Sequence, residues 1–113
     1  MMESTRQNKV ARLLQKDLSD IFQKADREIT QGRMVTVTTV RISPDLSVAK
    51  VYLSLFPSGE APAFKTHLQS HVKSIRLELG RRVRNQLRIV PELVFYIDDS
   101  LEYAARIDEL LKS

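Results

Sequence analysis

The chain has 113 residues, a formal net charge of +4 and no cysteine, and 42% of its residues are hydrophobic. This length suits one domain around one core, and no stretch approaches the roughly 18 consecutive apolar residues that span a membrane. Without cysteine, disulfide frameworks, thiolate metal sites and cysteine nucleophiles are excluded.

The first predicted element is a long helix from about Ser4 to Gly32. Its apolar residues recur at steps of three and four, which places them on one side of a helix: Val10, Leu13, Leu14, Leu18, Ile21, Phe22, Ala25 and Ile29. Ser4 and Gln7 fit a capping box at its start, and Gly32 fits its end. No apolar leader core precedes it, so we expect a cytoplasmic chain, with Met1 or Met2 as the start.

Two strands joined by a tight turn are predicted next. Residues 34–42 are rich in β-branched side chains, but the apolar positions change phase half-way along, which indicates a bulge or burial on both faces. In residues 47–56 every second side chain is apolar, as in a strand with one buried face. The Ser-Pro-Asp-Leu stretch at 43–46 supplies turn chemistry, so the two strands should form a hairpin.

Helical spacing returns between Phe64 and Ile89, after a break rich in proline and glycine, and Pro91 ends it. Because about 27 helical residues are long for a compact domain, we expect a bend or a break inside this segment. Alternating apolar residues at 93–97 predict a third strand, and Ser100 can cap a short final helix. The predicted order is therefore α-β-β-α-α-β-α.

Positive charge is concentrated in the second helical segment. Residues 65–91 carry seven basic residues and one acidic residue, whereas residues 92–113 carry two basic and six acidic residues. At 100° per residue, five of the basic side chains fall within an arc of about 140°, with a glycine inside it and Arg82 well away from it. We predict that RNA contacts this arc, which comprises Lys73, Arg76, Gly80, Arg81, Arg84 and Arg88. The alternative is a solvated helix face paired with the acidic C-terminal stretch.

Two further features bear on that prediction. The first helix carries a second basic stripe, which we predict as an auxiliary RNA contact: Arg6, Lys9, Arg12 and Lys16. Gly80 lies inside the arc although glycine costs a helix about 1 kcal/mol relative to alanine. Either it allows a bend, or its missing side chain allows a phosphate or a neighbouring element to come close. We favour close approach, with a packing contact against the sheet as the alternative.

Patterns that could serve catalysis have simpler explanations. His67 and His71 have the spacing of a metal pair, but no glutamate lies between them and no third ligand is recognisable, so we predict a surface or half-buried pair. Asp98 and Asp99 precede a predicted helix, whose positive end favours acids, so capping explains them. We predict no enzymatic activity, no cofactor and no metal.

Aromatic residues are few and lie on or at the ends of the predicted strands: Tyr52, Phe56, Phe95 and Tyr96. They do not form the aromatic pattern of an RRM domain, and we predict that they mainly pack in the core. Base stacking stays open for whichever of them faces solvent. The sheet is therefore predicted to be a scaffold.

The order of elements is that of a type II KH domain, and KH domains bind RNA. Several segments add to it: Ser43-Pro44-Asp45-Leu46-Ser47, Ala49-Lys50-Val51-Tyr52, Ile75-Arg76, Leu79-Gly80-Arg81, Val90-Pro91-Glu92-Leu93, Asp98-Asp99-Ser100 and Arg106-Ile107. Together, between Arg6 and Leu111, the chain resembles the ribosome-binding factor A family. The resemblance implies an α+β, type II KH-like fold with a three-stranded sheet and a short C-terminal helix. Residues 1–113 would form one RNA-binding domain, with a core of about 6–111.

The resemblance also implies a function. Members of this family bind free small (30S) ribosomal subunits and assist late maturation and 5′-end processing of pre-16S ribosomal RNA, including at low temperature. The expected partners are the small subunit and its RNA, together with other assembly factors that include an assembly GTPase. No membrane partner is expected, and the protein should be a monomer off the ribosome.

Two departures from the expected patterns concern the paired helices. An ordinary KH domain holds nucleotides with a Gly-x-x-Gly loop, and this chain has no such loop. The family's Ala-x-Gly kink would fall near residues 71–73, which read His-Val-Lys. The alternatives are a KH-like RNA-binding protein without ribosomal specificity, or a protein-interaction module that uses its acidic C-terminal helix.

Overall fold

The computed structural model describes residues 5–57 and 59–97 of the chain. Its elements, in chain order, are α1 (Thr5–Lys24), α2 (Arg27–Thr30), β1 (Met34–Ile42), β2 (Val48–Phe56), α3 (Ala61–Ser70), α4 (Val72–Val83) and β3 (Glu92–Ile97). This confirms the predicted α+β order, with α2 as an additional short turn of helix. The predicted C-terminal helix lies outside the described residues.

The three strands form one sheet in the order β1-β2-β3. β1 and β2 are antiparallel and form the predicted hairpin, whereas β3 runs parallel to β2. The pairing register shifts between Val37 and Thr39, so the phase change in the valines of β1 reflects a β-bulge. Thr38, the extra residue, donates a hydrogen bond from its hydroxyl to the carbonyl of Tyr52 at 3.2 Å. The bulge keeps both halves of β1 facing the core.

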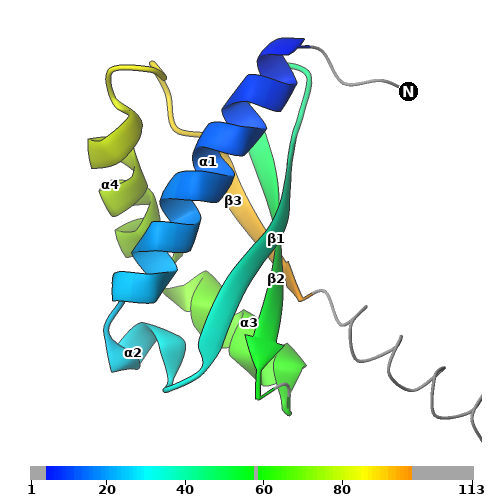
Figure 1. Cartoon of the computed structure of the whole chain (residues 1–113), viewed down its shortest axis with the longest axis vertical. Helices are drawn as coiled ribbons and strands as arrows, with labels where there is room; N and C mark the ends of the chain where they lie inside the picture. The colour runs from blue at the N-terminus through cyan, green and yellow to red at the C-terminus, as the bar shows by residue number, and fades with distance from the viewer. Residues whose placement is uncertain (1–4, 58, 98–113) are drawn as a thin grey trace, which may run out of the picture.

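The helices cover one face of the sheet. In β2, Ala49, Val51, Leu53 and Leu55 are buried, while the residues between them are exposed or half-buried. The buried set joins one core with apolar residues of α1, α3 and α4. Figure 1 shows α1 lying across the sheet with α4 beside it. No helix among the described residues is long and apolar enough to cross a membrane.

The first helical segment contains a break that the sequence pattern did not predict. α1 ends at Lys24, Asp26 takes an extended conformation, and α2 follows before Gln31 and Gly32 turn the chain with positive φ angles of 55° and 77°. The predicted single helix to Gly32 was therefore wrong, although the stop at Gly32 was right. α2 still packs Ile29 against the core, which explains why the apolar spacing continues across the break.

The second helical segment is broken at His71, as expected from its length, and it ends earlier than predicted. α4 stops at Val83, not near Ile89. The amides of Gln86 and Leu87 both donate to the Val83 carbonyl at 2.8 Å, which closes a turn there. This turn returns Leu87 to the edge of the core, so its spacing from Val83 still looked helical. The chain then passes through a loop of residues 84–91 into β3.

α3 protects the outer edge of β3. The Gln69 side-chain amide donates to the Leu93 carbonyl at 3.2 Å, and the Phe95 amide donates to the Gln69 side-chain oxygen at 3.4 Å. Unpaired edge groups of a strand invite pairing with other chains, and this side chain satisfies one donor and one acceptor. α3 is thereby held along β3. α4 begins directly after the break at His71 and buries Ile75, Leu79 and Val83 in the core.

Candidate nucleic-acid interface

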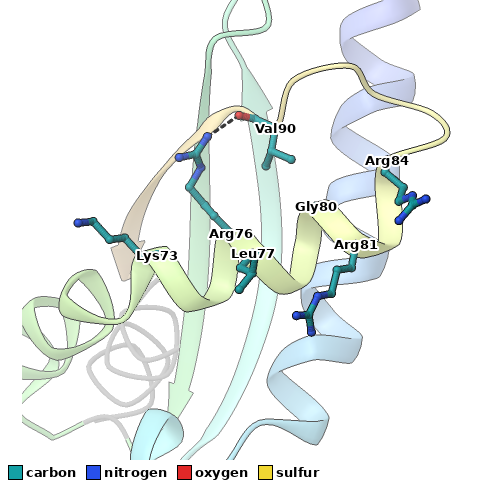
Figure 2. A pocket seen from close by; sticks show the side chains of 7 residues that line it. All are labelled: Lys73, Arg76, Leu77, Gly80, Arg81, Arg84 and Val90. Carbon is teal, nitrogen blue, oxygen red and sulfur yellow. Dashed lines mark hydrogen bonds between the residues drawn. The ribbon is translucent and has the colours of Figure 1, made fainter.

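A shallow groove runs along the outer side of α4 and is bounded by the loop that leads into β3. Its volume is about 520 Å³, and it is lined by Lys73, Arg76, Leu77, Gly80, Arg81, Arg84 and Val90. We call it the α4 groove (Figure 2). Residues three and four apart on a helix lie on one side, which explains why these members of the predicted arc come together. Five of the six predicted RNA-contact residues line it.

Arg76 has a structural task inside this groove. Its Nε donates to the carbonyl of Pro91 at 3.1 Å and its guanidinium nitrogen donates to the carbonyl of Val90 at 2.6 Å. Figure 2 shows the half-buried side chain reaching from α4 to the loop. Because a guanidinium has five N–H donors, these contacts leave further donors available. The primary role that the structure gives Arg76 is to hold the loop before β3.

Lys73, Arg81 and Arg84 have exposed side chains. Figure 2 shows their charged ends pointing away from the loop. Arg81 lies 3.7 Å from Glu78 in an exposed pair, and such pairs are weak and easily exchanged. Lys73 and Arg84 form no ion pair with any residue in 5–57 or 59–97. The α4 groove thus presents three cations that are available to an anionic ligand.

Arg82 lies on the other side of α4, as the sequence analysis predicted. Its guanidinium donates to Asp20 of α1 at 2.6 Å and to Glu78 at 3.4 Å. The hydrogen bonds from Arg82 and Lys24 hold the pKa of Asp20 below its ordinary value of 3.8. The hydrogen bond to Asp20 likewise raises the pKa of Arg82. This cation ties α1 to α4.

Gly80 lies where α4 approaches Val90. A Cβ atom at Gly80 would lie 3.3 Å from the Cγ2 atom of Val90, and its φ angle is outside the left-handed region. The prediction of a close approach at this position is therefore met by a neighbouring element of the chain itself. Gly80 packs against Val90 of the loop before β3, and not against the sheet as the packing alternative proposed.

Arg88 does not belong to the helical arc. It lies in the loop of residues 84–91, because α4 ends at Val83, and this part of the prediction was wrong. Arg88 instead lines a second hollow of about 250 Å³ together with Arg6 and Asp45. Hydrogen bonds from Ser47 and Ser43 lower the pKa of Asp45 to about 2, so the carboxylate stays charged there.

The second hollow is lined by members of two groups of basic residues that are separate in the sequence. Arg6 belongs to the auxiliary stripe on α1, and all four members of that stripe are exposed: Arg6, Lys9, Arg12 and Lys16. Because Arg6 and Arg88 line the same hollow, the stripe approaches the loop that also bounds the α4 groove. The basic surface therefore turns around the start of α1.

The aromatic residues differ from the prediction. Phe95 is fully buried and meets Phe22 edge-on, with ring centroids 6.1 Å apart. Phe56, by contrast, is 74% exposed, and Tyr52 and Tyr96 are half-buried and stack on each other at 5.3 Å. Core packing thus holds for Phe95 but not for the other three. The alternation in residues 47–56 predicts Tyr52 on the face opposite the buried side chains, and the structure places it there.

The histidine pair forms contacts within the protein. The rings of His67 and His71 meet edge-on with centroids 4.7 Å apart, and both residues are half-buried. The Nε2 atom of His67 lies 2.7 Å from the carbonyl oxygen of Glu28. In the part of the chain that the structure describes, no three potential ligands gather into a metal-binding group. Asp98 and Asp99 lie outside the described residues.

Comparisons with known proteins bear directly on this geometry. The model of the ribosome-binding factor A family matches residues 6–111. Ribosome-binding factor A of Cytophaga hutchinsonii is 46% identical over 110 residues, which cover 97% of this chain and 83% of that protein. The corresponding protein of Flavobacterium psychrophilum is also 46% identical, over 111 residues that cover 97% of this chain and 85% of that one.

Solved structures give the same result. The crystal structure of ribosome-binding factor A from Thermus thermophilus is similar with a TM-score of 0.69 and 26% identity, covering 80% of this chain and 93% of that one. Coordinates of the Thermus thermophilus factor fitted into a cryo-electron-microscopy map of a 30S–RbfA complex have a TM-score of 0.63 and 26% identity. They cover 87% of this chain and 97% of that one. The fold is KH-like, and this chain belongs to the ribosome-binding factor A family.

Proposed function

We propose that this protein is an assembly factor that binds free 30S subunits through the α4 groove. Its binding would assist late maturation and 5′-end processing of pre-16S ribosomal RNA, including at low temperature. The observation that carries the proposal is the set of three exposed cations, Lys73, Arg81 and Arg84, in one groove. The Thermus thermophilus factor, fitted into a map of a 30S complex, supports the choice of partner.

The chemistry of the groove suits a folded RNA backbone. Arginine presents a planar, permanently charged fork that can bind phosphate oxygens in a bidentate way. Leu77, which is 62% exposed, lies between the cations and gives the ligand an apolar surface to cover. No Gly-x-x-Gly loop is available to clamp single nucleotides in the usual KH manner. The proposed contact is therefore with phosphates, and selectivity would come from the shape of the RNA.

The remaining predicted residues enter the proposal with different roles. Arg76 would hold the loop and lend its free donors, and Gly80 would let that loop approach α4. Arg88 would join the auxiliary stripe of Arg6, Lys9, Arg12 and Lys16 in a second contact around the start of α1. Residues 1–113 would act as one cytoplasmic domain and as a monomer off the ribosome. Other assembly factors, including an assembly GTPase, would meet it on the subunit.

No catalytic step is part of this function. Binding alone can assist maturation, because a ligand that prefers one RNA conformation stabilises it by the difference in affinity. A factor that contacts phosphates can thus hold the 5′ region of the precursor in a conformation that processing enzymes accept. The need for it would be greatest in the cold, where misfolded RNA rearranges slowly.

Cosedimentation with free 30S subunits tests the proposal. The triple substitution Lys73→Gln, Arg81→Gln and Arg84→Gln should weaken binding by at least about tenfold, because it removes three phosphate contacts. It should leave the melting temperature nearly unchanged, because exposed charges contribute little to stability. The double variant Lys24→Gln and Arg27→Gln removes exposed cations elsewhere and is the control.

Two outcomes would count against the proposal. Equal binding of the triple variant and the control would move the contact away from the α4 groove. Equal binding of the unaltered protein to 30S subunits, 50S subunits and unrelated RNA would favour a general KH-like RNA-binding protein.

A further inference from the structure

The face of the sheet opposite the helices carries a group of exposed side chains that the proposed function does not use. Strand residues alternate between the two faces, and those between the buried positions of β1, β2 and β3 point away from α1. We call this the open sheet face. The members that matter here are Arg41, Lys50, Tyr52, Phe56, Val94 and Tyr96.

The centre of the open sheet face is a pair of stacked tyrosines. Tyr52 of β2 and Tyr96 of β3 are direct neighbours in the sheet, and their rings lie 5.3 Å apart at an angle of 21°. The Nζ atom of Lys65 lies 4.7 Å from the centre of the Tyr96 ring. Both tyrosines are half-buried, so part of each ring is accessible. Aromatic rings next to a cation offer a surface on which flat, electron-rich groups can stack.

The next row of the same face is a pair of like charges. Arg41 of β1 is directly opposite Lys50 of β2, and both are exposed. Like charges in directly opposite positions destabilise a sheet. Within residues 5–57 and 59–97, neither side chain forms an ion pair, and the only acid of this face is Glu92, which lies opposite Val48. An anionic ligand on this row would turn the repulsion into attraction.

The other end of the face is apolar. Met34 and Phe56 are direct neighbours across β1 and β2, and they are 68% and 74% exposed. Large apolar side chains exposed together mark contact surfaces more often than chance exposure does. The face thus runs from an exposed aromatic residue through a tyrosine pair to two unpaired cations.

We propose that the open sheet face binds unpaired RNA nucleotides. Bases would stack on Tyr52 and Phe56, while Arg41 and Lys50 would hold the phosphates. Proteins that bind single strands combine these two elements, an aromatic platform and a basic track beside it. A duplex keeps its bases stacked inside, so it can use the cations but not the rings. This site lies across the sheet from the α4 groove and stands independently of the function proposed for that groove.

NMR with the ¹⁵N-labelled full chain and a ten-nucleotide oligouridylate tests this proposal. At low salt, the oligouridylate should shift amide signals of β1 and β2 around Thr39, Arg41, Lys50 and Tyr52. A blunt-ended RNA duplex without unpaired nucleotides should shift the signals around Tyr52 far less. Affinity is measured in parallel by fluorescence anisotropy of the labelled oligouridylate.

Substitutions separate the rings from the charges. Tyr52→Leu should weaken oligouridylate binding about tenfold, whereas Tyr52→Phe should stay within about twofold, because stacking needs the ring and not the hydroxyl. Arg41→Gln combined with Lys50→Gln should also weaken binding about tenfold and lower its salt dependence. The melting temperature of this double variant should hold or rise, because like-charge repulsion is removed. Lys24→Gln combined with Arg27→Gln, which removes two exposed cations outside both surfaces, is the matched control and should leave oligouridylate binding unchanged.

Three results would overturn the proposal. The first is that oligouridylate shifts only signals of α4, and the second is that Tyr52→Leu binds as tightly as Tyr52→Phe. The third is that the open-face signals respond to deletion of residues 98–113 but not to oligouridylate, since the chain's own C-terminal segment would then occupy the face. None of these results would count against 30S binding by the α4 groove. The two proposals can therefore be disproved independently.

Discussion

The basic side chains of α4 form two groups that serve different purposes. Arg76 and Arg82 bind partners within the chain, namely the carbonyls of the loop before β3 and the carboxylate of Asp20. Lys73, Arg81 and Arg84 are exposed, and Figure 2 shows their charged ends pointing away from the loop. A basic helix is therefore not uniformly a binding surface. Part of its charge holds the domain together, and only the remainder can be offered to RNA.

The different roles of these cations follow from the groups that lie next to each side chain. A helix places side chains by angle, but a cation becomes structural only where a carbonyl or a carboxylate lies within hydrogen-bond distance. Such partners come from α1, which is remote in sequence from α4, and from the far end of the loop before β3. Charge-assisted hydrogen bonds are stronger than neutral ones, so these contacts persist when RNA is absent.

The largest expected effect concerns Arg76. Arg76→Met keeps the apolar stem but leaves the carbonyls of Val90 and Pro91 without their donor, and hydrogen bonds to charged groups contribute about 1.5–3 kcal/mol. We expect the free energy of unfolding to fall by about 2 kcal/mol, with a decrease of roughly 8–16 °C in melting temperature. Thermal denaturation followed by circular dichroism measures it. Arg84→Met should change the melting temperature little, and an equal loss in both variants would erase the distinction between the two groups of basic side chains.

A smaller effect is expected in the salt dependence of 30S binding. Each phosphate contact contributes about −0.7 to −0.9 to the slope of log affinity against log salt concentration. Arg81→Gln combined with Arg84→Gln should therefore make the slope about 1.5 units less steep. Arg82→Gln should leave the slope unchanged, because that side chain is occupied by Asp20. A change in slope on losing Arg82 would show that this side also meets RNA.

The sequence was sufficient wherever a local pattern decides the structure. The phase change of the valines indicated either a bulge or burial on both faces, and β1 has the bulge. The alternation in residues 47–56 predicted the buried face of β2. The length of the second helical segment predicted a bend or a break, and the family resemblance placed a kink near residues 71–73, where the structure breaks at His71. The family resemblance supplied the KH-like arrangement, which the solved structures confirm.

The sequence was insufficient wherever a contact between distant segments decides. Helical spacing continued from Val83 to Leu87 because the turn there returns Leu87 to the core, so the end of α4 was placed six residues too late. The role of Arg76 depends on carbonyls 14 and 15 residues further along the chain. The stacking of Tyr96 on Tyr52 depends on the pairing of β3 with β2, which no local pattern in the sequence predicts. The spacing of apolar residues predicts which face of an element is buried, but not which other segment packs against that face.

Acid should weaken the internal contacts before it affects the outward cations. Asp20 and Asp45 both have a lowered pKa in the folded protein, so their ionised forms stabilise it above their ordinary value of 3.8. That contribution is lost as the pH falls below 3.8, and for Asp45 the loss extends to about pH 2. Melting temperatures measured between pH 5 and pH 2 should therefore decrease.

The control for this acid sensitivity is a double variant. Asp20→Asn combined with Asp45→Asn should melt lower than the unaltered protein at pH 7. Its melting temperature should depend less on pH below 4, because the two carboxyl groups with a lowered pKa have been removed. Equal pH dependence in both proteins would assign the acid sensitivity to other carboxyl groups.

The smallest expected effect concerns Gly80, where α4 approaches the loop before β3. Alanine at this position gains about 1 kcal/mol in helix propensity, but its Cβ atom would crowd the Val90 Cγ2 atom at 3.3 Å. We expect the two effects to offset each other, so that Gly80→Ala changes the free energy of unfolding by less than about 0.5 kcal/mol.

The substitution Val90→Ala shows whether crowding against Val90 offsets the gain in helix propensity of Gly80→Ala. In that background the contact is gone, and Gly80→Ala should stabilise the protein by the full amount of about 1 kcal/mol. The difference between the two backgrounds is a coupling energy that denaturant titration of the four proteins can measure. If Gly80→Ala has the same effect in both backgrounds and weakens 30S binding in both, the space above Gly80 serves a phosphate of the RNA. If the coupling is found and binding is unchanged, the glycine exists for Val90, and RNA contacts only the cations around it.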